Sequence, residues 1–168
     1  MPKTHHVPLM LLIAAGVVAL DQLSKAMILA TQTPGVPTPI VGEIARLYLT
    51  FNSGAAFSFG RDHTWVFTLI QAAFVLGAAI AAPRITTRGT AVGTALIAGG
   101  AAGNLIDRLF RAPGFPVGHV VDFISIGHFA IFNLADAAIT CGASLIVVLV
   151  FLQPDAPADA PTTGQTHA

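Results

Sequence analysis

The feature that most constrains the fold is a set of four apolar segments, each long enough to cross a lipid bilayer. A helix rises about 1.5 Å per residue, so about 20 apolar residues span the hydrocarbon core. Hydrophobic residues make up 54% of the 168-residue chain and charged residues only 10%, unlike a soluble domain. The sequence therefore predicts an all-α membrane protein with four transmembrane helices. They cover approximately residues 7–29, 65–82, 89–110 and 131–152.

The first apolar segment has a second interpretation, because Lys3 precedes a short apolar core, as in a secretory leader. No small-x-small cleavage pattern follows at the right distance, however. Asp21 and Lys25 also stand four residues apart, a spacing that pairs opposite charges on one face of a helix. We therefore expect this segment to be retained as the first span.

The connection between the first two spans predicts a small β-like element. Its beginning, "TPGVPTPIVG" at 33–42, is too rich in proline for a regular helix. The following "RLYLTF" at 46–51 alternates apolar and polar side chains, which predicts a short strand. Small residues in "NSGAAFSFG" at 52–60 then indicate a tight turn or a closely approached backbone. Beyond the last span, residues 154–168 lack apolar periodicity, so we expect a single domain over 1–153 and a disordered tail.

An even number of spans places both termini on one side of the membrane and gathers the unusual polar residues on the other. Four of the eight acidic residues belong to this group. Ionisable groups at membrane depth are costly and usually mark a functional site. The group comprises Asp21, Lys25, Asn52, Asn104, Asp107, Arg108, Asp122, Asn133 and Asp136.

Spacing in the third span supports one shared site. Asn104, Asp107 and Arg108 follow one another at i, i+3 and i+4, so they project from one face of a helix. Just before them, Gly99 and Gly103 form a small-xxx-small pair that allows a neighbouring helix to approach closely. We interpret these glycines as packing positions only.

The fourth span carries two more polar residues near its start. Asn133 and Asp136 share a face at i, i+3, and Asp136 is expected about five residues, or roughly 7 to 8 Å, inside the helix. Asp122 precedes this span in a segment that we expect to be a loop. If both carboxyls point into one pocket, repulsion and burial make them share a proton near neutral pH. Such a pair can activate water and protonate a leaving amine, as an aspartyl peptidase requires.

Other functions are less well supported. The formal net charge is zero, which argues against nucleic-acid binding. His119, Asp122 and His128 suggest at most a weak metal site, and we expect no metal or cofactor. The main alternative is a small transporter or proton relay that uses the same acids, although such a relay needs polar groups through the depth of the membrane. Lys25 and Arg108 either orient the acid pair or balance its charge.

Five blocks in the sequence resemble the signature motifs of bacterial lipoprotein signal peptidases, or signal peptidase II. They are "DQLSK" at 21–25, "NSGAAFS" at 52–58, "GGAAGNLIDR" at 99–108, "VVDF" at 120–123 and "FNLADAAI" at 132–139. Any one block is a weak signal, but five in this order with these spans between them are specific. The resemblance extends over all but the two ends of the chain.

This resemblance implies a four-helix intramembrane aspartyl endopeptidase with a small extracytoplasmic β-like cradle. Such enzymes cut prolipoproteins just before a diacylglyceryl-modified cysteine, so lipidated prolipoproteins and membrane lipids are the implied partners, with no need for an oligomer. It also implies a multi-pass protein of the bacterial inner membrane with cytoplasmic termini and an active site near the extracytoplasmic face. By motif position, the catalytic dyad falls on Asp122 and Asp136. The supporting residues fall on Asp21, Lys25, Asn52, Gly54, Asn104, Arg108, Asn133 and Ala135.

Two segments depart from compact members of that family, and one of them, the segment that joins Asp122 to Asp136, is comparatively short. The segment "FRAPGFPVG" at 110–118 is longer and rich in proline and glycine, which predicts a flexible loop at the rim of the site. Asp107 matches its block but has no assigned role, and we expect it to form a structural pair with a neighbouring arginine.

Overall fold

The computed structural model describes residues 6–54 and 63–152 of the chain. Within them lie four helices that are long and apolar enough to cross a membrane, which confirms the predicted spans. A 3-10 turn, η3 (Ala82–Arg84), extends the second helix. The helices are α1 (Val7–Thr31), α2 (Thr64–Ala81), α3 (Arg88–Phe110) and α4 (Leu134–Phe151).

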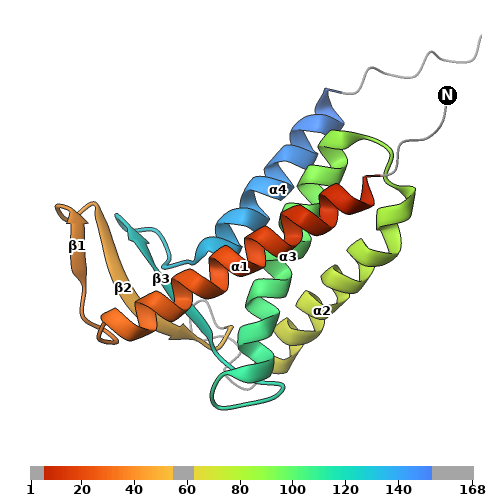
Figure 1. Ribbon diagram of the computed structural model, residues 1–168. Helices are drawn as coiled ribbons and strands as arrows, with labels where there is room; N and C mark the ends of the chain where they lie inside the picture. Colours follow the sequence, from red (N-terminus) through yellow and green to blue (C-terminus); the bar gives the residue numbers. More distant parts are fainter. Residues whose placement is uncertain (1–5, 55–62, 153–168) are drawn as a thin grey trace, which may run out of the picture.

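Helix α3 packs against each of the other three helices (Figure 1). Its small residues make this possible. A Cβ added at Gly99 would lie 3.0 Å from the Cα of Ala14 in α1, and one at Gly103 would lie 2.7 Å from the Asp21 carboxylate. The two glycines therefore let α1 approach α3 closely, as their spacing predicts.

A three-stranded antiparallel sheet lies beside one end of the bundle (Figure 1). Its strands are β1 (Thr38–Val41), β2 (Ala45–Asn52) and β3 (Val120–Ile126), in that order. Strand β2 confirms the strand predicted from alternation at 46–51. The expectation of a loop around Asp122 is wrong, because that residue lies within β3. The strand was missed because Asp122 and Ser125 are buried among apolar residues, so polar and apolar side chains do not alternate.

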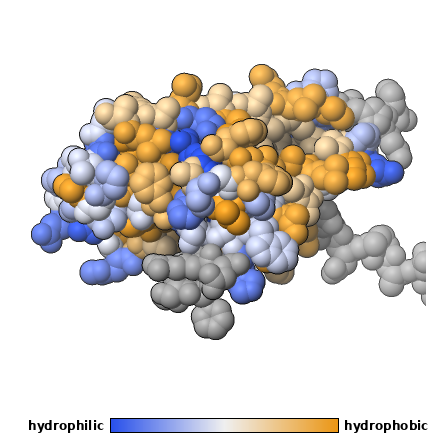
Figure 2. All heavy atoms as spheres, turned by 90° about the horizontal axis from the view of Figure 1, so that it is seen from below, coloured by the Kyte–Doolittle hydropathy of each residue, from blue (hydrophilic) through white to orange (hydrophobic). Residues whose placement is uncertain are grey.

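An apolar cluster joins the sheet to the bundle. Ile28, near the end of α1, packs with Leu49 of β2 and with Val121 and Phe123 of β3. The start of α1 and the end of α4 lie at the opposite end of the bundle from the sheet (Figure 1). On the face seen in Figure 2, hydrophobic side chains cover much of the surface, and hydrophilic ones gather mainly toward the end with the sheet. The tail expected at 154–168 lies outside the described residues.

Candidate active site

Asp136 lies in the first turn of α4, at the membrane end that carries the sheet. Asn133 is the N-cap of this helix, and its side-chain oxygen accepts from the Asp136 N–H at 2.9 Å. The Asp136 carboxylate accepts in return from the Asn133 N–H at 3.2 Å, which completes a capping box. The expectation that Asp136 lies five residues inside the helix is therefore wrong. An asparagine side chain competes for backbone N–H groups, so the helix begins only after Asn133.

Asp122 projects from β3 toward Asn52 on the paired strand β2. The Asn52 amide donates to the Asp122 carboxylate at 2.8 Å, and its oxygen accepts from the Gly54 N–H at 2.7 Å. Gly54 has φ of 99°, a conformation that disfavours residues with a side chain. The turn thus fixes the Asn52 amide with its donor side toward Asp122. The rest of the predicted turn, from residue 55, lies outside the described residues.

Asn133 connects the two carboxylates. Its side-chain amide donates to Asp122 at 2.6 Å, while its backbone N–H donates to Asp136. Asn104 of α3 supplies a second donor to Asp136, at 2.8 Å from its side-chain nitrogen. The structure thus brings together both predicted acids with the three asparagines that the motifs singled out, Asn52, Asn104 and Asn133.

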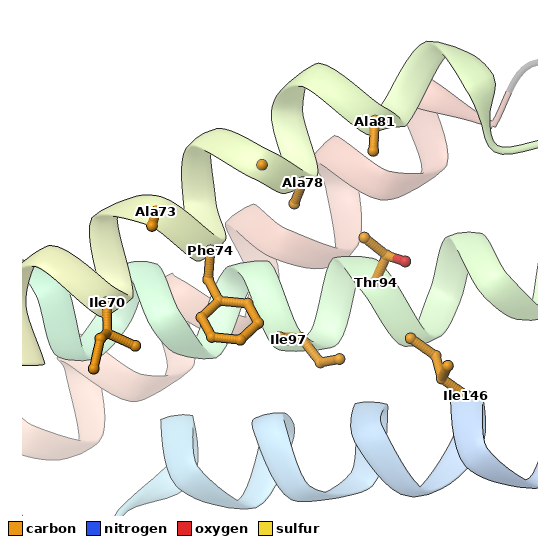
Figure 3. A pocket seen from close by; sticks show the side chains of 9 residues that line it. Ile70, Ala73, Phe74, Ala78, Ala81, Thr94, Ile97 and Ile146 are labelled. Atoms are coloured by element: carbon orange, nitrogen blue, oxygen red, sulfur yellow. The ribbon is translucent and has the colours of Figure 1, made fainter.

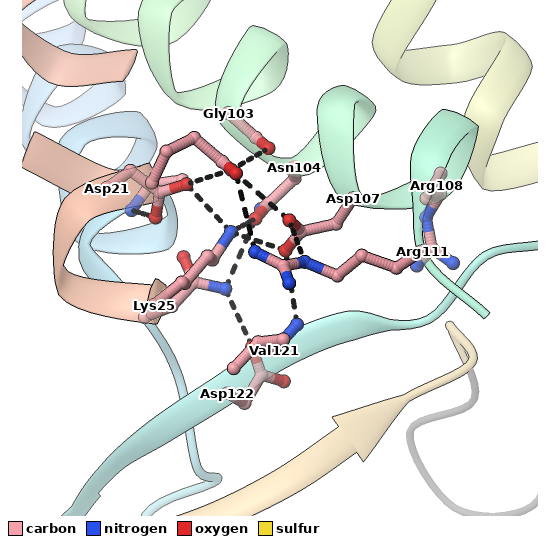
Figure 4. Close-up of polar contacts among 12 residues, drawn as sticks. Asp21, Lys25, Gly103, Asn104, Asp107, Arg108, Arg111, Val121 and Asp122 are labelled. Carbon is pink, nitrogen blue, oxygen red and sulfur yellow. Dashed lines mark hydrogen bonds and ion pairs between the residues drawn. The ribbon is translucent and has the colours of Figure 1, made fainter. Parts of the chain in front are cut away.

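A second group of charges lies beside the first, between α1 and α3 (Figure 4). The Lys25 ammonium lies 2.8 Å from the carboxylates of both Asp21 and Asp107, and all three side chains are fully buried. Asp107 also pairs with Arg111, as expected for a structural pair with a neighbouring arginine. We call Asp21, Lys25, Asp107 and Arg111 the ion cluster. Its two anions and two cations balance.

Three hydrogen bonds join the ion cluster to Asn104 and to the residues that precede the two acids. Lys25 donates to the side-chain oxygen of Asn104 at 2.9 Å, which leaves the nitrogen of that amide facing Asp136. Asp21 accepts from the backbone N–H of Ala135 at 3.1 Å. Asp107 accepts from the backbone N–H of Val121 at 3.2 Å.

Arg108 is also buried, but it is outside the ion cluster. Its guanidinium donates to the Gly118 carbonyl at 3.2 Å and lies over the Phe67 ring of α2, 5.5 Å from the centroid. Only 3% of the residue is exposed, and its Nε has no partner among the described residues. Arg108 is thus a buried cation held by an aromatic face and a carbonyl.

Burial raises the pKa of Asp122 from its usual 3.8 to about 6. The negative charge of Asp136 contributes in the same direction, whereas the hydrogen bonds from Asn52 and Asn133 act in the opposite one. A carboxyl with this pKa gains and loses its proton near neutral pH, which suits acid–base chemistry.

The sequence did not single out Gln22, and it left open which neighbouring arginine pairs with Asp107. The Gln22 amide donates to Asp107 at 3.2 Å and to the Gly103 carbonyl at 3.0 Å, so it joins α1 to α3. Arg111 stands four residues after Asp107, a spacing that was available as a signal. Nothing in the sequence distinguishes Gln22 from a solvated glutamine.

Among the described residues, no three His, Cys, Asp or Glu side chains form a cluster that could hold a metal ion. His119 lines a surface hollow with Phe51. Asp122, by contrast, accepts from Asn52. Phe51 and Asn52 are consecutive residues of β2, so their side chains point to opposite faces of the sheet, and the partners His119 and Asp122 lie on opposite faces with them. The structure therefore does not bring His119 and Asp122 together as the weak metal hypothesis requires.

An apolar groove of about 600 Å³ runs between α2, α3 and α4 (Figure 3). Its wall on α3 includes Ile97, which stands seven residues, or about 10 Å along the helix, before Asn104. The groove thus lies deeper in the bundle than the acid pair. It is lined by Ile70, Ala73, Phe74, Gly77, Ala78, Ala81, Thr94, Ile97 and Ile146.

Sequence comparisons with known proteins agree on one family. A sequence model described as signal peptidase (SPase) II matches residues 13–152. A lipoprotein signal peptidase of Rhodococcus jostii (strain RHA1) is 46% identical over 92% of this chain and 79% of its own length. One from Mycobacterium avium (strain 104) is 48% identical over 84% of this chain and 78% of its own. A solved structure of a bacterial membrane enzyme superposes with a TM-score of 0.79 at 28% identity, over 92% of this chain and 99% of that chain.

Proposed function

The chain belongs to the signal peptidase II family, and on this premise we propose that it is an aspartyl endopeptidase whose dyad is Asp122 and Asp136. Membership of the family makes it a multi-pass membrane protease that removes signal peptides from lipoproteins. The observation that carries the dyad assignment is the bridging role of Asn133. One residue donates to both carboxylates, so both face the same small volume.

The two acids divide the work between base and acid. The ionised carboxylate takes a proton from water, and the water oxygen attacks the carbonyl carbon of the scissile peptide bond. The protonated carboxyl donates to the carbonyl oxygen, giving a neutral tetrahedral diol. The dyad then donates its proton to the amide nitrogen and takes one from a hydroxyl of the diol, so the C–N bond breaks, the amine and the carboxylic acid leave, and the dyad again holds one proton.

The neighbouring amides orient the two carboxyls without fixing their protonation state. Asn52 and Asn133 donate to Asp122, and Asn104 with the Asn133 backbone donates to Asp136. A neutral donor stabilises a carboxylate less than a cation does, so the proton remains free to transfer. Arg108 supplies a nearby positive charge, held in place by Phe67 and the Gly118 carbonyl.

The proposed substrate is a prolipoprotein with a diacylglyceryl-modified cysteine, cut just before that cysteine. Asp122 lies in β3 and Asp136 in the first turn of α4, so the acid pair lies at one end of the spans, where a lipid-linked cysteine would meet the membrane surface. The apolar groove between α2, α3 and α4 suits apolar parts of such a substrate, because its lining is almost wholly hydrocarbon.

In this proposal, the sheet end is extracytoplasmic and both termini are cytoplasmic. Residues 1–153 act as one domain in the inner membrane, with residues 154–168 as a cytoplasmic tail. Membrane lipids are partners, and no oligomer is required. The buried polar residues among those described lie late in α1 and α3, early in α2, in β3 and at the start of α4, so they gather at one end of the bundle, which argues against a proton relay through the full membrane.

A cleavage assay with a lipidated prolipoprotein tests the dyad. Asp122→Asn and Asp136→Asn should each lower kcat by about 1,000-fold or more, because each removes one side of a concerted acid–base pair. Thermal unfolding in detergent serves as the control that both variants fold. Full activity of either folded variant would overturn the assignment, and a proton flux in proteoliposomes without cleavage would favour the transporter.

A further inference from the structure

The ion cluster contacts the backbone next to each catalytic acid, on two different elements. Asp21 accepts from the N–H of Ala135, the residue before Asp136 on α4. Asp107 accepts from the N–H of Val121, the residue before Asp122 on β3. Lys25 lies between Asp21 and Asp107 at 2.8 Å from each. A continuous polar chain thus joins the backbone just before one acid to the backbone just before the other.

We propose that Asp107 is a positioning residue that sets the location of Asp122 relative to Asp136, through the Val121 N–H and the Lys25–Asp21 pair. This inference rests on the proposed function of the two acids. Asp107 contacts neither acid directly, so it acts through the backbone and not as a catalytic residue.

The two oxygens of the Asp107 carboxylate have separate partners. Oδ2 accepts from Val121 and faces Lys25, whereas Oδ1 faces Arg111 and Gln22. Both sets of donors are satisfied at once only by a carboxylate in this place. The side chain is fully buried, so water cannot replace either set.

The carboxylate also ties strand β3 to α3. Strand β3 is held as well by β2, by the pairing of Ile124 with Phe132, by the cluster around Ile28 and by the bond from Asn133 to Asp122. The Val121 N–H adds a direct hydrogen bond to α3. Helix α3 also carries Asn104, which donates to Asp136. Movement of β3 along α3 would therefore move one acid relative to the other.

Asp107→Glu tests the proposal because it keeps the charge and lengthens the side chain by one methylene, about 1.5 Å. The long side chains of Lys25 and Arg111 can follow the displaced carboxylate, but the Val121 N–H can follow only if β3 moves. A 1 Å misplacement of catalytic groups costs on the order of 100-fold, so kcat per folded molecule should fall about 100-fold while KM stays within about threefold. The pH–activity profile should shift as well, because the surroundings of Asp122 change.

Arg111→Lys is the matched control, because it alters the partner of the other Asp107 oxygen and leaves the Val121 contact in place. Its kcat should stay within about threefold of the parent. A merely structural role for Asp107 predicts instead that Asp107→Glu lowers the amount of folded protein while kcat per folded molecule and the pH profile stay unchanged. That result would overturn the proposal.

If Asp107→Glu does not fold, replacement of Val121 by its α-hydroxy acid decides the question. This change removes a single N–H and keeps the side chain. It should lower kcat about tenfold, the factor expected for loss of one hydrogen bond to a charged group. An unchanged kcat would overturn the proposal. The dyad assignment fails separately, through activity in Asp122→Asn or Asp136→Asn.

Discussion

The ion cluster and the acid pair are neighbouring sets of buried carboxylates with opposite surroundings. Asp21 and Asp107 each contact the Lys25 ammonium at 2.8 Å. Asp122 and Asp136 have no Lys, Arg or His in ion-pair contact among the described residues, and neutral asparagine amides donate to both. The difference separates two uses of a buried charge. A countercation balances the charge of a buried carboxylate and fixes its place, whereas amide donors position a carboxyl that, in the proposed dyad, gains and loses a proton.

The largest expected effect comes from removal of the countercation in the ion cluster. Lys25→Met keeps much of the side-chain volume but leaves Asp21 and Asp107 buried with only Arg111 to balance them. Breaking a buried pair in this way costs about 3 to 5 kcal/mol, so thermal unfolding in detergent should show a much less stable protein. Asp122→Asn, the matched change in the acid pair, should leave stability at pH 8 within about 1 kcal/mol or raise it. Equal destabilisation by both variants would contradict the distinction.

The sequence predicts the helices, the strand and the polar residues of both groups, but not the hydrogen bonds that join the two groups. The length of the apolar runs predicts the four spans, and the alternation of apolar and polar residues predicts the strand at 46–51. The i, i+4 spacing predicts the Asp21–Lys25 pair. Both acids and their asparagines follow from the motif resemblance. The bonds from the Ala135 and Val121 N–H groups to the ion cluster could not be foreseen, because every residue except proline has such a donor and the side chain gives no sign of its use.

Strand β3 and the start of α4 show a related limit. Helix or strand is recognised by the period of apolar side chains, and a buried polar residue interrupts that period. Asp122 interrupts it in β3, and Asn133 interrupts the apolar run before α4. Because residues of an active site are both polar and buried, the local pattern is least informative at the site itself.

A smaller effect on stability tests whether the ion cluster requires the space left by the missing side chain of Gly103, in addition to balanced charges. A Cβ added at Gly103 would lie 2.7 Å from the Asp21 carboxylate, which Lys25 and the Ala135 N–H hold in place. Gly103→Ala should therefore cost about 1 to 3 kcal/mol by overpacking, measured by thermal unfolding. Gly16→Ala is the control on α1, where an added Cβ meets nothing within 4 Å. It should be neutral or stabilising by up to about 1 kcal/mol, and equal loss in both variants would contradict the argument.

The smallest expected effect is a shift in the titration of Asp122, which sharpens the other half of the comparison. Its pKa of about 6 lies above the usual 3.8, so the folded protein binds this proton more tightly than the unfolded chain does. The contribution of this group to stability is therefore full below about pH 4 and falls as pH rises toward 6. Asp136→Asn removes a nearby negative charge and should lower the Asp122 pKa.

Asn52→Ala should raise the same pKa, because it removes a hydrogen bond that favours the ionised form. Infrared or ¹³C NMR titration of the carboxyl measures both variants without any need for activity. Shifts of opposite sign are the outcome that matters, since a general loss of structure would expose Asp122 and lower its pKa in both. If neither variant moved the titration, neutral amides and the second acid would not control the proton, and the acid pair would differ from the ion cluster in geometry alone.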